Sequence, residues 1–499
     1  MSGNFFADLH EVFVDNATRP CFIFAEGGGW SFADLEERIG DTCGALLRAG
    51  VRPGNRIVAQ VEKSPEAVVL YLASLRVGAV YVPLNTAYTT SEVEYFIDDA
   101  KPALFVCDPK VEADNPHGAI HTLDAEGEGS LTYAMGKSEP FTGVIARKKG
   151  DVAAILYTSG TTGRSKGAML THENLRSNAL ATSACWSWGE RDVLLHALPI
   201  FHVHGLFIAL HCALLGGTTT IFARRFDVAE ILEWLPRATV MMGVPTYYAR
   251  LLKEPSFGAD RCAGVRLFIS GSAPLTEQAH QAFEARTGQK ILERYGMSEA
   301  VVITTNPLDG ERVAGTVGYA LPGVEVRVAD ESGTPVAADE VGMIEVRGQS
   351  LFSGYWQMPE KTAEEIRADG FFITGDLGTL SRDGRLTIVG RSKDLIISGG
   401  YNVYPKEVEQ ALDELDEVFE SAVFGVPHDD FGEAVVAAVV PTGDELSQAA
   451  IDAALGSTLA RFKQPKRVIN VAELPRNAMG KVQKNQLRDG YAELFSTPT

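Results

Sequence analysis

The eleven residues YTSGTTGRSKG, 157–167, constrain the fold of this chain more than any other stretch. They follow an apolar run, Val152 to Leu156, that is typical of a buried strand, and they precede a segment, 174–184, that can form a helix. Glycines let the backbone turn tightly and present its N–H groups inward, while hydroxyls and the ammonium of Lys166 add donors and positive charge. The stretch therefore predicts a loop that holds the oxygens of a polyphosphate.

This loop does not have the spacing of the Walker loop, which would need glycine in place of Ser165 and serine or threonine in place of Gly167. A flexible surface turn is the plainer alternative, and the preceding strand and the cations Arg164 and Lys166 argue against it. YTSGTTGRSKG resembles the phosphate loop of the adenylate-forming enzymes, which include acyl-CoA synthetases, luciferases and peptide-synthetase adenylation domains. Further motifs of that family follow in order and cover nearly the whole chain.

The length of 499 residues predicts more than one domain. Apolar runs at 56–61, 79–83 and 103–107 alternate with helical patterns at 30–49 and 66–77, which indicates a parallel sheet with crossover helices. Residues 108–150 are polar and are expected to be a linker. We therefore expect an α/β protein with a large N-terminal domain, 1–393, of parallel or mixed sheets and flanking helices. It should contain a β-rich subdomain at about 315–390 and be followed by a small mobile α+β C-terminal domain, 394–499.

Charge and cysteine usage restrict the partners and the compartment. The net charge of −20 argues against nucleic acid or an anionic membrane as the main partner. The six cysteines form no C-x-x-C pair, which is typical of a reduced, cytosolic protein. No apolar run reaches the roughly 18 residues of a membrane span, and the start lacks a signal-peptide core. We expect a cytoplasmic protein that acts on small molecules, without a membrane or nucleic-acid partner.

Two later motifs extend the family resemblance to the nucleotide. ERYGMSE, 293–299, resembles Y-G-x-T-E and implies that Tyr295 stacks on adenine, Ser298 donates to the α-phosphate and Glu299 holds Mg²⁺. ITGD, 373–376, resembles T-G-D, whose aspartate accepts both ribose hydroxyls. The predicted nucleotide-binding residues are Thr158, Ser159, Gly160, Thr161, Thr162, Gly163, Lys166, Ser272, Glu293, Tyr295, Gly296, Ser298, Asp376 and Arg391, and the predicted Mg²⁺ ligands are Glu299 and Thr158.

The chemistry implied by the resemblance is the activation of a carboxylate. LPRNAMGKV, 474–482, resembles P-R-x-x-x-G-K, whose lysine touches the substrate carboxylate and the α-phosphate. Because negative charge builds on the α-phosphate oxygens, catalysis needs cations and donors, and we expect Lys481, Lys166 and Glu299 with Mg²⁺ to supply them. Coenzyme A would then attack the acyl-adenylate after the C-terminal domain turns about a hinge at Asp394 and withdraws Lys481. ATP, Mg²⁺ and coenzyme A are the expected cofactors and co-substrates.

Three segments are expected to line the acid pocket. HALPIFHVHGL, 196–206, ends a strand in two histidines, His202 and His204, that would share one face of an extended segment. A zinc site lacks a third ligand nearby, and a hydrogen-bonded core histidine remains an alternative for each. The runs 239–246 and 267–274 pass from strand to loop and should wall the same cleft, with Gly243 and Ser270 to Ser272 facing the ligand.

Arg294 indicates which class of acid the site binds. A fatty or aromatic acid would leave its guanidinium buried and unpaired, which is costly, whereas a short dicarboxylate would pair with it. HVHGLF, ERYGMSE and PRNAMGKVQK together resemble the malonyl-CoA synthetase branch, while the apolar segment 300–303 departs from it and leaves methylmalonate open. The predicted substrate-binding residues are His202, His204, Arg294, Gly243 and Ser270.

The predicted function is ATP-dependent ligation of malonate to coenzyme A through malonyl-adenylate. A synthetase for another short or aryl acid is the first alternative. A non-catalytic nucleotide binder, a luciferase-like oxidase and a carrier-protein adenylation domain are the others, although no carrier segment adjoins this chain.

Overall fold

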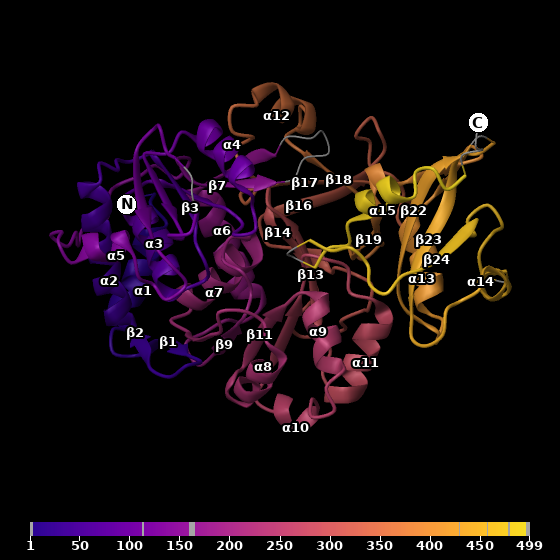
Figure 1. Ribbon diagram of the computed structural model, residues 1–499, viewed down its shortest axis with the longest axis horizontal. Helices are drawn as coiled ribbons and strands as arrows, with labels where there is room; N and C mark the ends of the chain where they lie inside the picture. Colours follow the sequence, from indigo (N-terminus) through magenta and orange to yellow (C-terminus); the bar gives the residue numbers. More distant parts are fainter. Residues whose placement is uncertain are drawn as a thin grey trace.

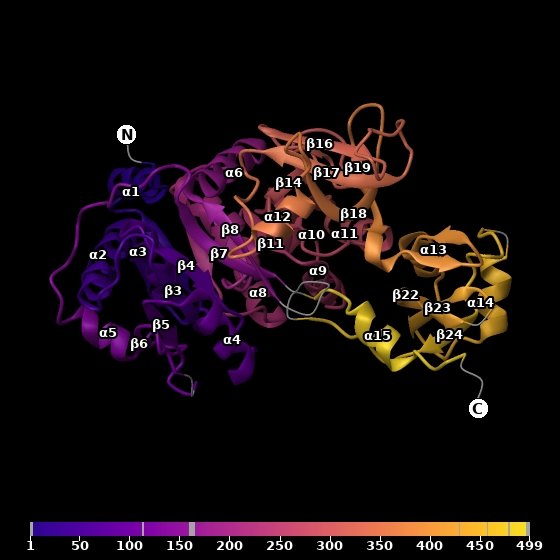
Figure 2. The same cartoon turned by 90° about the horizontal axis from the view of Figure 1, so that it is seen from above.

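The computed structural model describes residues 3–111, 114–158, 165–428, 430–456, 458–477 and 480–495. The first helices and strands lie at one end of the molecule and the C-terminal elements lie at the other end, in both views (Figures 1 and 2). The predicted fold class is confirmed, because a large N-terminal part of mixed sheets and helices is followed by a smaller C-terminal part. None of the helices built from the described residues is both long and apolar enough to cross a membrane.

The first sheet contains the strand that leads into the predicted phosphate loop. Its strands are β3 (Arg56–Gln60), β4 (Val80–Pro83), β5 (Leu104–Cys107), β6 (Ala119–Thr122), β7 (Val152–Thr158) and β8 (Lys166–Thr171). They are ordered β6-β5-β3-β4-β7-β8, and all neighbours are parallel except β7 and β8. The central strands are buried on both faces, which explains their continuous apolar runs.

The second sheet brings most of the candidate site together. Its strands are β1 (Pro20–Phe24), β2 (Gly29–Ser31), β9 (Val193–His196), β10 (Thr219–Phe222), β11 (Val240–Gly243), β12 (Leu267–Ser270), β13 (Leu292–Met297), β14 (Val301–Thr305) and β15 (Tyr319–Ala320). The strands are ordered β15-β14-β13-β12-β11-β9-β10-β1-β2. Those from β13 to β1 run parallel to one another, whereas β14 and β2 pair antiparallel with β13 and β1. Gly243 pairs in register with Ser270, and Ser270 with Glu293, so these carboxyl ends meet at one edge as predicted.

Helices occur along the whole described chain, and some of them cover the two faces of the first sheet. The helices are α1 (Phe6–Asp15), α2 (Phe32–Arg48), α3 (Pro65–Arg76), α4 (Thr90–Ala100), α5 (Ser130–Met135), α6 (His172–Cys185), α7 (Leu210–Leu215), α8 (Val228–Trp234), α9 (Pro245–Leu252), α10 (Ala259–Cys262), α11 (Glu277–Thr287), α12 (Pro359–Glu365), α13 (Pro405–Asp413), α14 (Gln448–Leu455) and α15 (Lys484–Gly490), with the short turns η1 (His204–Ala209), η2 (Leu235–Arg237) and η3 (Ser392–Asp394). Ser31 caps α2 in a capping box with Asp34, so the helix expected within 30–49 begins at Phe32. The helices α2 and α3 pack on one face of the sheet and α4 packs on the other.

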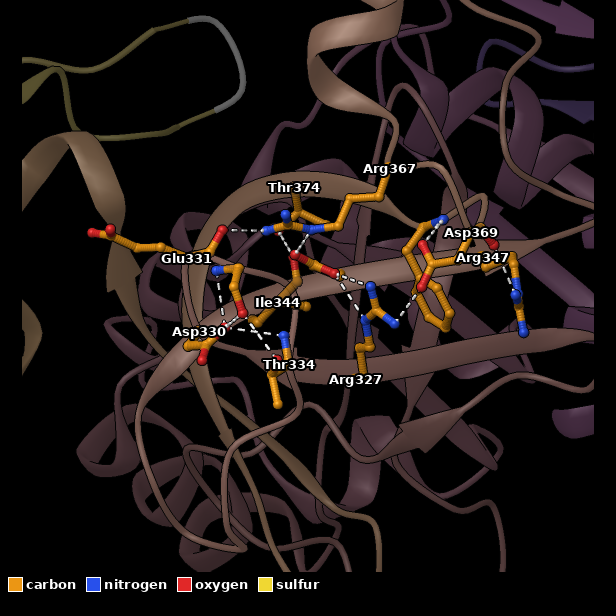
Figure 3. Close-up of polar contacts among 12 residues, drawn as sticks. Arg327, Asp330, Glu331, Thr334, Ile344, Arg347, Arg367, Asp369 and Thr374 are labelled. Carbon is orange, nitrogen blue, oxygen red and sulfur yellow. Dashed lines mark hydrogen bonds and ion pairs between the residues drawn. The ribbon is translucent and has the colours of Figure 1, made fainter.

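The predicted β-rich region forms a separate antiparallel sheet. Its strands, in order, are β16 (Val324–Ala329), β17 (Gly342–Gly348), β18 (Phe372–Leu380) and β19 (Leu386–Arg391). Glu345 of β17 is fully buried, and its carboxylate accepts from Nε of Arg327 at 2.8 Å and from Nε of Arg367 at 2.5 Å. Arg327 also pairs with Asp369 at 2.7 Å, as Figure 3 shows. The network fixes the segment after α12 to the sheet.

The C-terminal part is an α+β unit with its own core. Its strands are β20 (Ile396–Ser398), β21 (Tyr401–Val403), β22 (Val418–His428), β23 (Gly432–Pro441) and β24 (Arg467–Asn470). Val408 and Leu412 of α13 are buried against this sheet. The exact boundary at 393/394 and the rotation about Asp394 remain predictions.

Three local expectations were wrong. Residues 108–150 contain β6 and α5 and are more than a linker, because short amphipathic runs inside a polar stretch escaped the pattern. Lys166 and Gly167 lie in β8, which pairs with β7 before the helix begins. The strand β9 ends at His196, and His204 opens the π-helical turn η1, so the two histidines do not share an extended segment.

Candidate active site

The ribose end of the predicted site is well ordered around Asp376. Asp376 of β18 is 4% exposed and lies opposite Arg391 of β19. Tyr295 donates its hydroxyl to one carboxylate oxygen at 2.6 Å, and Nε of Arg391 lies 2.7 Å from the other. The backbone N–H of Asp376 donates to Thr374 at 3.1 Å, which fixes the carboxylate from below. Three residues predicted from separate motifs thus meet at one acceptor that suits a vicinal diol.

A second group joins the predicted phosphate and metal residues. Nζ of Lys166 lies 2.9 Å from Glu365 and 4.3 Å from the ring centroid of Tyr355. The Tyr355 hydroxyl lies 2.7 Å from Glu365 and 3.0 Å from Glu299, and its single proton can serve only one of them at a time. Burial raises the pKa of Glu299, while Tyr355 and Lys166 act in the opposite direction. A buried carboxylate of this kind fits a hard cation, whose charge would favour its ionised form.

Lys481 reaches this site from the C-terminal part. The residue as a whole stays exposed. Its ammonium interacts electrostatically with Arg391, Asp376, Arg294 and Glu299. Desolvation, followed by the charge of Arg391, lowers the pKa of Lys481 to about 8. The structure therefore brings Lys481 to the residues with which the resemblance groups it.

The two histidines lie on the acid side of the site. His204 is fully buried, and its Nδ1 lies 3.2 Å from Oγ of Ser272. Ser272 has a φ of +73°, a strained conformation that directs its hydroxyl toward this ring. Burial and then the charges of Lys481 and Arg294 lower the pKa of His202 to about 3, so both the charges and the desolvation keep its ring neutral. Neutral imidazoles can donate to a carboxylate but do not neutralise it.

Arg294 is the main unpaired charge of the site. It is 4% exposed, and its Nε and Nη2 are buried without a hydrogen-bond partner in the described part of the chain. Burial lowers the pKa of Arg294 to about 9. A Cβ on Gly271 would lie 2.5 Å from Nε and from Cζ of Arg294, so glycine leaves the space that the guanidinium occupies. An anion beside Arg294 would satisfy these buried donors.

The remaining predicted residues lie in five places. Gly243 and Ser270 lie at the ends of β11 and β12, where the Ser270 hydroxyl is buried and unpartnered among described atoms. Glu293 lies 3.5 Å from His280, on the other side of β13 from Arg294. A Cβ on Gly296 would lie 1.9 Å from the Val301 carbonyl oxygen, so the turn that carries Ser298 requires glycine. Thr158 donates to the Lys166 carbonyl oxygen at 3.4 Å. The residues Ser159, Gly160, Thr161, Thr162 and Gly163 lie outside the described ranges.

Comparison with known proteins assigns the family. A family model described as "AMP-binding enzyme" matches residues 10–356, and one described as "AMP-binding enzyme C-terminal domain" matches residues 407–481. The chain belongs to the AMP-binding enzyme family. The family resemblance expected from the sequence is thereby confirmed.

Individual relatives of this AMP-binding enzyme share its fold over almost the full length. The ATP-bound structure of MatB from Rhodopseudomonas palustris is 50% identical, with a TM-score of 0.96 over 99% of this chain and 100% of that one. A malonate–CoA ligase of Arabidopsis thaliana is 34% identical over 88% of this chain and 78% of its own length. A long-chain-fatty-acid–CoA ligase of Bacillus subtilis (strain 168) is 32% identical over 97% of this chain and 95% of its own length. The two ligases that are named for different acids, malonate and a long-chain fatty acid, thus have nearly the same sequence identity to this chain.

Sequence reasoning missed several residues of this AMP-binding enzyme's site. Tyr355 and Glu365 lie between β17 and β18, about 200 positions after Lys166, and no local pattern marks them. Gly271 stands inside a stretch that was singled out, but the guanidinium behind it cannot be read from the sequence.

Proposed function

We propose that this AMP-forming acid–CoA ligase activates malonate, at the expense of ATP, and transfers the malonyl group to coenzyme A. The products would be malonyl-CoA, AMP and pyrophosphate. The observation that carries the substrate is the buried, unpaired Arg294 beside His204. An acid with a second carboxylate supplies the missing partner, whereas an acid with an apolar tail would leave the charge desolvated and alone.

In the first half-reaction the chain's residues mainly orient and neutralise. Asp376 and Arg391 would hold the ribose, and Tyr295 would form the face for adenine. One carboxylate of malonate would face Arg294 while the other attacks the α-phosphorus and displaces pyrophosphate. Lys481 and Lys166 would meet the charge that develops on the phosphate oxygens. Mg²⁺, which Glu299 and Thr158 would hold, supplies further positive charge to the phosphates when bound.

In the second half-reaction the thiol of coenzyme A attacks the malonyl carbonyl carbon and AMP leaves. The lysine loop must first withdraw, which we assign to rotation of residues 394–499 about Asp394. Asp394 is held by Arg488 of α15 at 2.9 Å in the orientation described here. We expect these steps in the cytoplasm, with no carrier protein, membrane or nucleic acid involved.

A substrate panel tests the proposal. AMP and pyrophosphate release should be measured with malonate, methylmalonate, succinate, acetate and benzoate at equal concentration, with coenzyme A present. Malonate should give the highest kcat/KM, and methylmalonate should differ from it by roughly 10–200-fold at most, because one methyl group contributes about 1–3 kcal/mol. A preference for acetate or benzoate would establish the alternative of another short or aryl acid. Absence of ATP–pyrophosphate exchange with every acid would establish a non-catalytic nucleotide binder.

A further inference from the structure

Lys63 is a buried lysine that the chemistry above does not use. It lies between β3 and the N-cap Ser64 of α3, and only 7% of it is exposed. Its Nζ lies 2.9 Å from the carbonyl oxygen of His196, 2.6 Å from that of Ala223 and 2.7 Å from Nδ1 of His196. Burial lowers the pKa of Lys63 well below its usual range, while the three acceptors around Nζ match the three protons of an ammonium and favour that form. Lys63 thus joins the first sheet to the carboxyl ends of β9 and β10 in the second sheet.

The proton positions of the His196 ring follow from its two partners. Burial and then the charge of Lys63 lower the pKa of His196, so the imidazole is neutral. Its Nε2 lies 3.0 Å from the carbonyl oxygen of Gly205, which can only accept a proton. Nε2 therefore carries the hydrogen, and Nδ1 accepts from Lys63. The ring also stacks on Phe222 with an interplanar angle of 3°.

This chain of hydrogen bonds ends at the acid side of the site. Gly205 belongs to η1 and directly follows His204, which contacts Ser272. A Cβ on Gly205 would lie 2.1 Å from the Pro199 carbonyl oxygen, so the backbone of the turn is closely packed where the His196 ring holds it. π-Helical turns of this kind are unusual and often lie at functional sites.

We propose that Lys63 and His196 are positioning residues for the acid: they fix the backbone of residues 202–205 and so the placement of the two histidines. Neither residue has a described contact with Asp376, Tyr295 or Lys166, so their influence falls on the acid and not on the nucleotide. The inference rests on the proposed function, in which His202 and His204 face the acid.

The test is a separation of acid and nucleotide parameters. Lys63→Met keeps the length of the side chain and removes all three donors. We expect the KM for malonate to rise about tenfold or more, as the loss of buried hydrogen bonds implies, while the KM for ATP stays within about twofold. His196→Phe keeps the ring on Phe222, removes both hydrogen bonds and should give the same selective rise. It carries the test if Lys63→Met does not fold. Lys63→Arg, which keeps charge and donors, should restore part of the malonate affinity.

The matched control is Thr239→Val, directly before β11 and beside the first residue of β9, at the end of the strands opposite to Gly243 and Ser270. Thr239 donates to Asp192 at 2.8 Å and accepts from the backbone of Val193 at 2.8 Å. Its loss should lower the Tm without changing the KM for malonate. The proposal is overturned if Lys63→Met lowers the Tm as Thr239→Val does and leaves the malonate KM unchanged. It is also overturned if the KM values for malonate and ATP rise together.

A spectroscopic readout separates this inference from the choice of substrate. In protein labelled with ¹⁵N-histidine, the ring signals of His204, identified by their loss in His204→Asn, should shift in Lys63→Met and stay in place in Thr239→Val. An unmoved His204 signal contradicts the positioning role. A wild-type enzyme without malonate turnover contradicts only the proposed substrate.

Discussion

At the scale of single residues, Arg294 has the largest expected influence on both the choice of acid and the stability of the free protein. A guanidinium that is desolvated and unpaired costs folding free energy that only a ligand returns. Activity and stability should therefore oppose each other at this position, as is common where a site is built at the expense of the free protein.

Arg294→Met tests this opposition. The kcat/KM for malonate should fall by roughly two to four orders of magnitude, because losing the partner of a buried carboxylate costs about 3–5 kcal/mol. The Tm of the ligand-free protein should rise, since an apolar side chain replaces an unpaired charge. Steady-state kinetics and calorimetry measure the two effects. A fall in malonate turnover of less than about tenfold would remove the dicarboxylate assignment.

Lys481 gives a prediction about pH. Its pKa is lowered to about 8, and only the ammonium form can neutralise a phosphate oxygen. Pyrophosphate release at low substrate concentrations should therefore be highest below pH 8 and fall as the pH rises through this value. Lys481→Arg, whose guanidinium stays protonated, should be slower and lose this alkaline limb. An unchanged limb in the arginine variant would assign it to another group.

At the scale of elements, the β-rich sheet supports the site from behind. Its buried carboxylate, Glu345, accepts from Arg367 (Figure 3), which lies two residues after Glu365 at the end of α12. Glu365 in turn pairs with Lys166. Thr374, in the same sheet, connects the Ile344 carbonyl oxygen at 2.8 Å to the backbone of Asp376. A substitution of a buried residue in this sheet should therefore lower the stability of the protein first.

Arg367→Met should lower the free energy of unfolding by about 3 kcal/mol, since it leaves a fully buried carboxylate with one partner removed. Arg347→Met is the matched control in the same sheet. Its pair with Glu325 is exposed and should contribute only about 0–1 kcal/mol. Urea denaturation measures both, and equal effects would show that burial of the pair is not what matters.

Elements were predictable where one pattern ran long enough. The apolar runs of β7, β11 and β12 and the helical pattern of α2 are local, so their approximate positions followed from the sequence. The position of the π-helical turn at His204 did not, because the His196 ring contacts its Gly205 carbonyl oxygen and is itself held by Lys63, which lies 133 positions before His196. In the same way, Tyr355 meets Glu299 only through folding, and no spacing encodes that contact.

At the scale of the whole molecule, the site is shared between the large and the small part. Lys481 lies among Arg391, Asp376 and Glu299, while Gly480 lies close to Thr246 of α9. This orientation suits the first half-reaction, and a domain rotation would take Lys481 away before the thiol arrives.

Lys481→Ala should separate the two half-reactions. Formation of malonyl-adenylate, measured by ATP–pyrophosphate exchange, should fall by at least about 100-fold, as for loss of one charge-stabilising donor. Conversion of supplied malonyl-adenylate and coenzyme A to malonyl-CoA should stay near the wild-type rate. If both rates fall together, Lys481 acts outside adenylation as well.

Because Lys481 lies late in the chain, it is synthesised after the other charged residues of the site. Asp376, Tyr295 and Glu299 all precede Lys481 by more than 100 residues, so the ribosome adds them to the growing polypeptide well before it adds this lysine. A nascent chain would therefore be able to bind a nucleotide well before it could use one in adenylation.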